Sequence, residues 1–132
     1  MYSLDKIKQL ISEYEFNDDF DTIVAIANGG IIPAALLNQR LGLDFRLIRL
    51  SLRDKDQRPI YDKPQLVSPL SFDPKGRRIL LVEDRVKTGA TMAYAKRLLE
   101  EGGAELVKTF AVNGSADYPL LDVPCFRFPW IL

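Results

Sequence analysis

The chain has 132 residues, of which 47% are hydrophobic and 27% charged, and these values are typical of one soluble globular domain. Its 18 Lys and Arg balance its 18 Asp and Glu, and this neutrality argues against a general nucleic-acid binder, which is usually basic. The absence of histidine and the single cysteine, Cys125, exclude histidine bases, histidine metal ligands, an intrachain disulfide and a multi-thiolate metal site.

The chain alternates the patterns of helices and strands. Ser3 is a candidate N-cap for a first helix, Pro33 suits the first turn of a second, and Gly42 suits its end. Apolar runs bounded by polar turn residues predict buried strands of a mostly parallel sheet. The expected elements are helix 3–15, strand 22–27, helix 31–41, strand 45–50, strand 79–83, helix 88–101 and strand 106–112. This alternation predicts an α/β fold.

Two segments fall outside the alternation. Residues 51–78 are rich in charge and contain four prolines, which disfavours helix. A long polar connection in so small a domain is often a mobile active-site loop, and a solvated β-hairpin without function is the equal alternative. Residues 113–132 predict an irregular stretch followed by a short aromatic tail.

Residues 79–91 combine an apolar strand, the pair Glu83-Asp84 and a turn rich in Thr and Gly. The pair falls at the carboxyl end of the strand, where open α/β sheets bind ligands. Its carboxylates can accept hydrogen bonds from sugar hydroxyls or hold Mg²⁺ directly or through water. The turn over 88–91 offers backbone N–H groups to a phosphate. The stretch therefore predicts a ribose 5-phosphate site; the alternative is an acidic strand end and a capped helix without a ligand.

The turn Asn28-Gly29-Gly30, between a predicted strand and a predicted helix, is a second candidate anion site. The alternative is a tight strand-to-helix turn that needs glycine for its backbone freedom. Its pairing with the later 88–91 turn favours the anion site.

These motifs resemble those of one family. Residues 79–91 resemble the phosphoribosyl diphosphate (PRPP) signature of type I phosphoribosyltransferases: an apolar strand, two acids, three variable residues and Thr-Gly-x-Thr. Residues 24–34 are similar to the family's pyrophosphate loop, and Phe128-Pro129-Trp130 resembles the end of short microbial xanthine- and hypoxanthine-type purine members. The resemblance implies a single domain over 1–132: a three-layer fold with a twisted, mostly parallel sheet of about five strands, helices on both faces and a small C-terminal hood.

The resemblance also implies a role for each motif residue. Glu83 and Asp84 would bind the ribose hydroxyls and lie close to Mg²⁺, the expected cofactor. The 5-phosphate would be bound by Lys87, Thr88, Gly89, Ala90 and Thr91. The pyrophosphate would be bound by Ala27, Asn28, Gly29 and Gly30, with a cis peptide at Ala27-Asn28. The 51–78 loop would close over the site, and the hood over 113–132 would recognise the base, with Phe126 and Phe128 as candidates.

The implied activity is Mg²⁺-dependent transfer of 5-phosphoribosyl from PRPP to a nitrogenous base, with a purine favoured, giving a nucleoside monophosphate and pyrophosphate. Family members usually associate, so a homodimer or higher homo-oligomer is expected. No apolar run approaches membrane-spanning length and the N-terminus does not resemble a signal peptide. We therefore expect a cytoplasmic protein whose ligands are PRPP and a nucleobase, with neither nucleic acid nor membrane as a partner.

Three residues depart from the family's pattern. Asn28 stands where many members carry Arg or Lys, and it brings no charge to the leaving pyrophosphate. Lys87, the candidate catalytic residue, stands where hypoxanthine-guanine members carry an Asp proposed to assist proton transfer. Cys125 aligns with a base-stacking tryptophan. These departures keep two alternatives open: a PRPP- or nucleotide-binding regulatory protein with little transferase activity, and another ribose-phosphate enzyme such as a nucleotide hydrolase.

Overall fold

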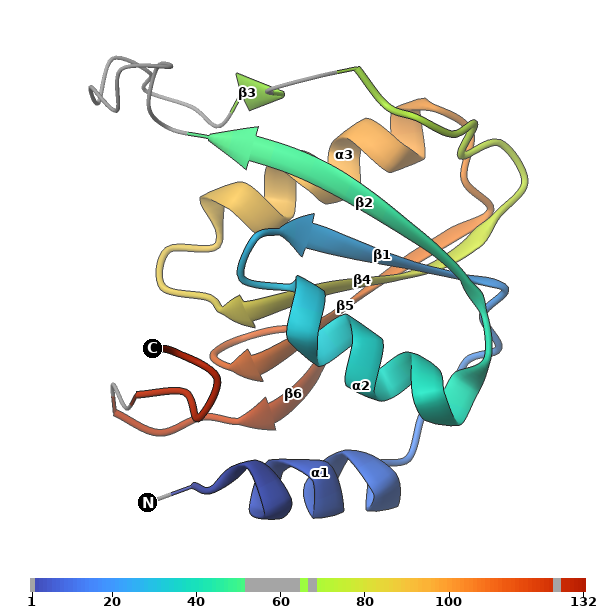
Figure 1. The fold of residues 1–132 in the computed structure, drawn as a ribbon. Coiled ribbons are helices and arrows are strands. Elements are labelled where there is room, and N and C mark those ends of the chain that lie inside the picture. Colours follow the sequence, from blue (N-terminus) through green and yellow to red (C-terminus); the bar gives the residue numbers. More distant parts are fainter. Residues whose placement is uncertain (1, 52–64, 67–68, 125–126) are drawn as a thin grey trace.

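The computed structural model describes residues 2–51, 65–66, 69–124 and 127–132, which form an α/β fold around a six-stranded sheet (Figure 1). The elements are α1 (Leu4–Glu13), β1 (Thr22–Ala27), α2 (Ile31–Leu41), β2 (Asp44–Ser51), β3 (Gln65–Leu66), β4 (Arg78–Arg85), α3 (Ala90–Glu101), β5 (Leu106–Asn113) and β6 (Tyr118–Leu121). The strand order is β3-β2-β1-β4-β5-β6. Neighbours from β2 to β6 are parallel, and β3 is antiparallel to β2.

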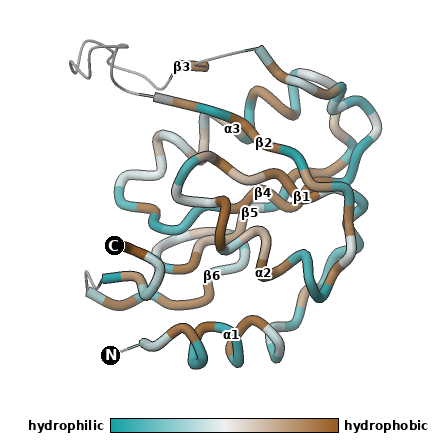
Figure 2. The backbone as a smooth tube through the Cα atoms, in the orientation of Figure 1, coloured by the Kyte–Doolittle hydropathy of each residue, from teal (hydrophilic) through white to brown (hydrophobic). Residues whose placement is uncertain are grey.

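The sheet separates two hydrophobic cores because alternate strand residues face opposite sides. In β1 and β4, Ile23 and Leu80 pack with α1 and α2, whereas Val24 and Leu81 pack with α3. Figure 2 shows the hydrophobic residues concentrated along these central strands. The predicted three-layer α/β fold, with about five parallel strands and helices on both faces, is confirmed. None of the helices in the described part of the chain is long and apolar enough to span a membrane.

The predicted helix and strand bounds hold closely in the first half of the chain. The Oγ atom of Ser3 accepts a hydrogen bond from the Lys6 N–H at 3.1 Å, which confirms the N-cap of α1. The bounds of β1 and α2 are those predicted. Later, β4 extends two residues beyond the predicted strand, to Arg85, and α3 begins at Ala90 rather than at residue 88.

Strand β6 was not predicted, because it lies in the segment expected to be irregular. Its sequence contains Pro119, which cannot donate a ladder hydrogen bond and therefore argues against a central strand. At the sheet edge a proline is tolerated, and Pro119 lies opposite Ala111 of β5. The predicted hood over 113–132 thus begins with residues that belong to the sheet.

The predicted 51–78 loop is shorter than expected, because Ser51 ends β2 and Arg78 begins β4. Before β4, a turn joins the sheet to the end of α3: the Gly76 N–H donates to the Gly103 carbonyl at 2.9 Å. Residues 52–64 and 67–68 lie outside the described residues. A loop that closes over the site therefore stays a prediction.

Candidate active site

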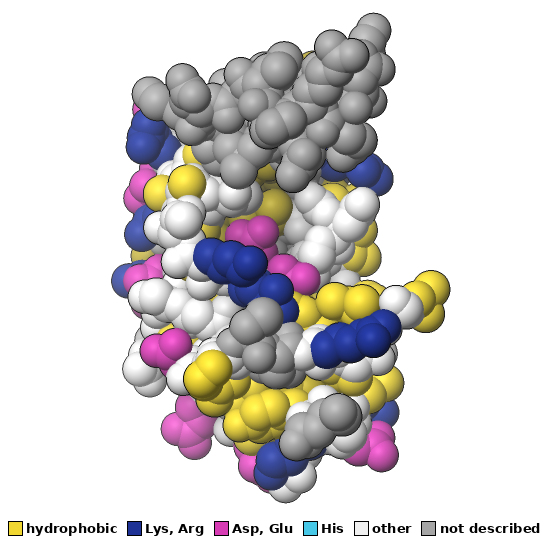
Figure 3. Space-filling model, turned by 90° about the vertical axis from the view of Figure 1, so that its left-hand side faces the viewer, with side chains coloured by type: hydrophobic (Ala, Val, Ile, Leu, Met, Phe, Trp, Pro, Cys, Tyr) yellow, Lys and Arg dark blue, Asp and Glu magenta, His cyan; other side chains and the backbone are white. Residues whose placement is uncertain are grey.

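A cavity of ≈ 430 Å³ opens at the carboxyl end of β4. The face onto which the parallel strands end is hollowed there, with acidic side chains at its centre and basic ones beside them (Figure 3). The cavity is lined by Glu83, Asp84, Arg85, Val86, Lys87, Thr88, Gly89, Ala90, Thr91, Met92, Phe128 and Ile131. It therefore brings together the predicted carboxylate pair, every predicted 5-phosphate residue and one predicted base-binding residue.

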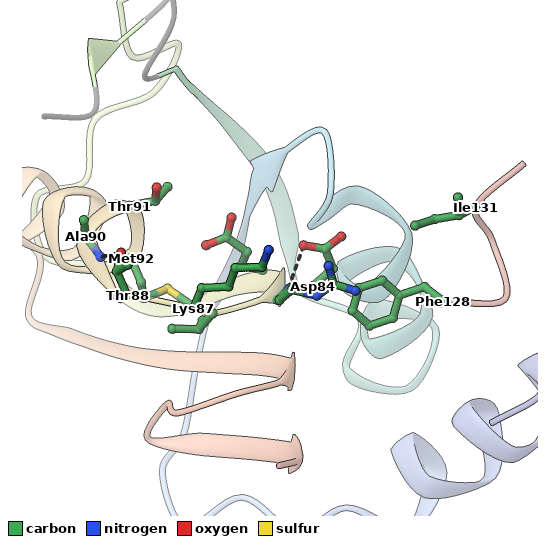
Figure 4. Close-up of a pocket in the computed structure, with 12 residues that line it drawn as sticks. Asp84, Lys87, Thr88, Ala90, Thr91, Met92, Phe128 and Ile131 are labelled. Carbon is green, nitrogen blue, oxygen red and sulfur yellow. Dashed lines mark hydrogen bonds between the residues drawn. The ribbon is translucent and has the colours of Figure 1, made fainter. Parts of the chain in front are cut away.

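The 88–91 turn forms one side of the cavity (Figure 4). Gly89 has a left-handed backbone (φ 82°) and is the N-cap of α3 without a side-chain cap. The Ala90 N–H donates to the Oγ1 atom of Thr88 at 3.3 Å. The first turn of the 12-residue helix α3 thus begins at the cavity, where the positive end of its dipole favours an anion.

The carboxylates of Glu83 and Asp84 differ in their surroundings. One oxygen of Asp84, Oδ1, accepts a hydrogen bond from the Arg85 N–H at 2.6 Å. Burial raises the pKa of Glu83 from 4.5 to about 7, and the neighbouring charge of Asp84 adds to the increase. Glu83 therefore binds a proton more readily than an exposed glutamate, and a cation beside it would favour the ionised form.

The turn over 27–30 packs against Asp84 and the backbone of β4. The Ala27-Asn28 peptide is cis, as the family resemblance implied. A Cβ atom on Gly29 would lie 2.6 Å from Asp84 Oδ1, and one on Gly30 would lie 2.3 Å from the carbonyl oxygen of Val82. At Gly30 the blocking atoms belong to the backbone, so only glycine fits there, whereas a side chain at 29 would displace the Asp84 carboxylate. Residues 27–30 are not among the described residues that line the cavity. Gly29 instead contacts Asp84, and Asp84 lines the cavity.

Arg49 lies beside the 27–30 turn, a placement that the sequence did not reveal. Its Nη1 atom lies 3.4 Å from Asn28 Oδ1, within donor distance. Arg49 lies opposite Ala27 in the parallel β1–β2 pair, which brings its side chain beside the turn. The charge that Asn28 does not provide is therefore available from the neighbouring strand. Only the strand register, which is not visible in a single sequence, connects Arg49 to Asn28.

Residues 127–132, the C-terminal segment, close the other side of the cavity through Phe128 and Ile131. The Phe128 ring is 1% exposed and stacks on Trp130, with ring centroids 5.1 Å apart and planes 3° apart. The guanidinium carbon of Arg85 lies 5.0 Å from the Phe128 ring centroid. Phe128 is thus a fixed wall of the cavity, and base stacking on it stays a prediction. Phe126 and Cys125 lie outside the described residues.

Residues 2–125 match the family model described as the phosphoribosyl transferase domain. The chain belongs to the phosphoribosyltransferase family. It is 31% identical over 110 residues to the orotate phosphoribosyltransferase of Sulfurisphaera tokodaii, covering 83% of this chain and 48% of that protein. It is also 31% identical over 120 residues to the hypoxanthine/guanine phosphoribosyltransferase of Methanohalophilus mahii, covering 86% and 62%. The chain thus spans about half to three fifths of the length of these two relatives.

The fold is also that of solved members of the family. The purine phosphoribosyltransferase from Pyrococcus horikoshii superposes with a TM-score of 0.79 at 23% identity, and the match covers 97% of this chain and 90% of that one. At this identity the likeness concerns the fold alone.

The charges of the cavity at the end of β4 are mixed. Two acidic residues, Glu83 and Asp84, stand beside two basic ones, Arg85 and Lys87. In Figure 4 the Lys87 side chain extends toward Asp84 and away from Thr91. The described residues contain no group of three or more side chains that could hold a metal by themselves, so a cation here would need oxygen ligands from the substrate as well.

Proposed function

We propose that this chain transfers the 5-phosphoribosyl group from PRPP to a nucleobase, with a purine favoured, and releases pyrophosphate. The observation that carries the proposal is the packing of Gly29 against Asp84. It places both predicted anion-binding turns beside Asp84, and PRPP has a matching set of groups: a 5-phosphate, ribose hydroxyls and a pyrophosphate. A hydrolase of nucleoside monophosphates would need only one of the two turns, because its substrate has a single phosphate.

Each part of the substrate has a matching set of donors or acceptors. The N–H groups and hydroxyls of 88–91 suit the 5-phosphate. The carboxylates of Glu83 and Asp84 accept hydrogen bonds from the ribose hydroxyls. The backbone of 27–30 and the guanidinium of Arg49 suit the pyrophosphate, since a bidentate guanidinium is a strong phosphate partner. Lys87 remains a candidate for the 5-phosphate or for catalysis.

The residues present fit Mg²⁺ as part of the substrate complex. Mg²⁺ in phosphate-binding sites is usually held by one or two carboxylates together with phosphate oxygens and water. Glu83 and Asp84 would hold it, directly or through water, together with oxygens of PRPP. Bound there, Mg²⁺ would neutralise charge on the leaving pyrophosphate.

The reaction is a displacement at the anomeric carbon. A bond forms from a base nitrogen to C1 as the bond from C1 to the pyrophosphate oxygen breaks, the electron pair leaves with pyrophosphate, and the N–H proton of the base passes to solvent. The chain's contribution is to fix the reacting groups at the strand ends and to exclude water from them. Arg49 and the 27–30 backbone stabilise the charge that develops on the leaving group.

The direct test is pyrophosphate release from PRPP and Mg²⁺ with each common nucleobase in turn. Turnover with at least one base is expected, and Asp84→Asn should weaken PRPP binding at least about tenfold. Asp5→Asn, an exposed change on α1, is the control and should leave binding and turnover as they are. Binding of PRPP without turnover on any base would instead support the regulatory alternative, and absence of PRPP and nucleotide binding would refute both.

A further inference from the structure

Arg85 is the last residue of β4 and directly follows the carboxylate pair. It lines the same cavity as Asp84 and as the 88–91 turn. Its backbone N–H donates to Asp84 Oδ1, so its position is tied to that of the ribose-binding carboxylate. The proposed function assigns a role to the residues on both sides of Arg85, but none to its side chain.

The two ends of the cavity are lined by different parts of the chain. In Figure 4, Thr88, Ala90 and Thr91 lie on one side of Asp84, and Phe128 and Ile131 lie on the other. If the proposed function is right, a ribose held by Asp84 with its 5-phosphate on the 88–91 turn presents its anomeric carbon toward Phe128 and Ile131. The base must then enter between the carboxylate pair and the C-terminal segment, which is where the Arg85 guanidinium lies.

The Arg85 side chain is held in this position by its surroundings. Its guanidinium carbon lies over the Phe128 ring at 5.0 Å, a cation–π arrangement. Phe128 is itself buried and stacked on Trp130. Nearby, the Asn113 side chain and the Val123 backbone exchange two hydrogen bonds of 3.1 and 3.0 Å, which fasten the chain leading to this segment onto the end of β5. A guanidinium fixed in this way can discriminate between ligands because it does not simply move aside.

We propose that Arg85 selects the acceptor base and favours bases that carry carbonyl oxygens on the edge facing it. A guanidinium has five N–H donors and no acceptor. Hypoxanthine, guanine and xanthine present a carbonyl oxygen where adenine carries an amino group, which is also a donor. Adenine would therefore place its amino group, a hydrogen-bond donor, against the N–H donors of the Arg85 guanidinium. Uracil and orotate also carry carbonyl oxygens, so the inference concerns this shared chemistry, and the test separates the two ring systems.

The inference rests on the proposed function and is tested by nucleotide binding as well as turnover. Titration calorimetry with the whole chain would compare PRPP, inosine, guanosine, uridine and adenosine monophosphates. The wild type should bind an oxo-base nucleotide at least about tenfold more tightly than adenosine monophosphate. Arg85→Met should remove most of that preference, Arg85→Lys should retain part of it, and PRPP affinity should stay within about threefold in both. The control is Arg127→Met, an exposed arginine outside the cavity lining, which should keep the wild-type preference.

The outcomes distinguish failure of the Arg85 inference from failure of the proposed function. A wild type that prefers adenosine monophosphate, or an Arg85→Met variant with an unchanged preference, overturns the inference while the proposed function stands. A large loss of PRPP affinity in Arg85→Met would show that the guanidinium binds the pyrophosphate or phosphate and also overturns it. Failure of the wild type to bind PRPP or any nucleotide overturns the proposed function and the inference with it. Preference for inosine or guanosine over uridine monophosphate identifies an oxopurine as the acceptor, and the reverse identifies an oxopyrimidine.

Discussion

Gly29 and Asp84 are in contact across the ends of two neighbouring parallel strands: a Cβ atom on Gly29 would lie 2.6 Å from Asp84 Oδ1. The sequence places these residues 55 positions apart, and the pairing of β1 with β4 brings them together. A larger residue at this position would therefore displace the Asp84 carboxylate, which places the 27–30 turn directly beside the acid pair.

Gly29→Ala should accordingly weaken PRPP binding at least about tenfold, because the added methyl group displaces the Asp84 carboxylate from the position proposed for accepting hydrogen bonds from the ribose hydroxyls. Titration calorimetry with PRPP would measure the loss. Gly102→Ala is a matched control, since its Cβ would lie 2.4 Å from Pro74 Cγ, far along the chain from the site. The control should lose stability but keep its PRPP affinity. Equal PRPP affinity in Gly29→Ala and wild type would contradict the assignment.

Glu83 should make the stability of the ligand-free protein fall as the pH rises. Its pKa is about 7 in the folded state and 4.5 when exposed, so between these values the folded protein keeps a proton that the unfolded chain releases. The folded state therefore loses relative stability from about pH 4.5 to 7, by at most about 3 kcal/mol before solvent screening. Above pH 7 both states are ionised and the loss is complete.

Urea unfolding of wild type and Glu83→Gln at pH 5 and pH 8 tests this dependence. The amide cannot ionise, so the difference in unfolding free energy between the variant and wild type should shift in favour of the variant at pH 8. Parallel pH profiles for the two proteins would refute a raised pKa. Mg²⁺ with PRPP should reduce the wild-type dependence, because a cation beside Glu83 favours its ionised form.

Local patterns were sufficient for much of this fold but not for the contacts that complete its site. Helix α2 was predicted within its observed bounds because Pro33 and Gly42 mark its ends, and the motif residues of β4 and the following turn line one cavity as expected. Strand β6 was missed because Pro119 argues against a strand unless its place at the sheet edge is known.

The contacts of Arg49 with Asn28 and of Arg85 with Phe128 were also not predicted. The first contact depends on the register between β1 and β2, and the second depends on how residues 127–132 fold back onto β4. The periodicity of a single sequence contains no information on strand register or on the path of such a segment.

Arg49 should contribute to pyrophosphate binding rather than to ribose binding. Arg49→Met should weaken PRPP affinity by about 10- to 150-fold, the loss of a hydrogen bond to a charged group, and leave ribose 5-phosphate affinity within about twofold. The control is Arg46→Met on the same strand, whose guanidinium instead pairs with Asp44 at 3.0 Å. Equal losses for PRPP and ribose 5-phosphate would show that Arg49 acts on the fold of the site as a whole.

Gly89 should be needed for the 5-phosphate turn because of its backbone conformation. Gly89 and Gly42 both have positive φ angles, 82° and 65°, and in both cases a Cβ atom would meet nothing within 4 Å. Alanine at either position should therefore cost about 1–2 kcal/mol of stability, through left-handed backbone strain alone. Chemical denaturation would measure this shared cost, and calorimetry with ribose 5-phosphate would separate the two variants.

Only Gly89→Ala should lose phosphate affinity, at least about tenfold, because relief of its strain moves the N–H groups at the start of α3. If both variants bind ribose 5-phosphate as the wild type does, the phosphate is held by side chains, and Lys87 becomes the first residue to replace.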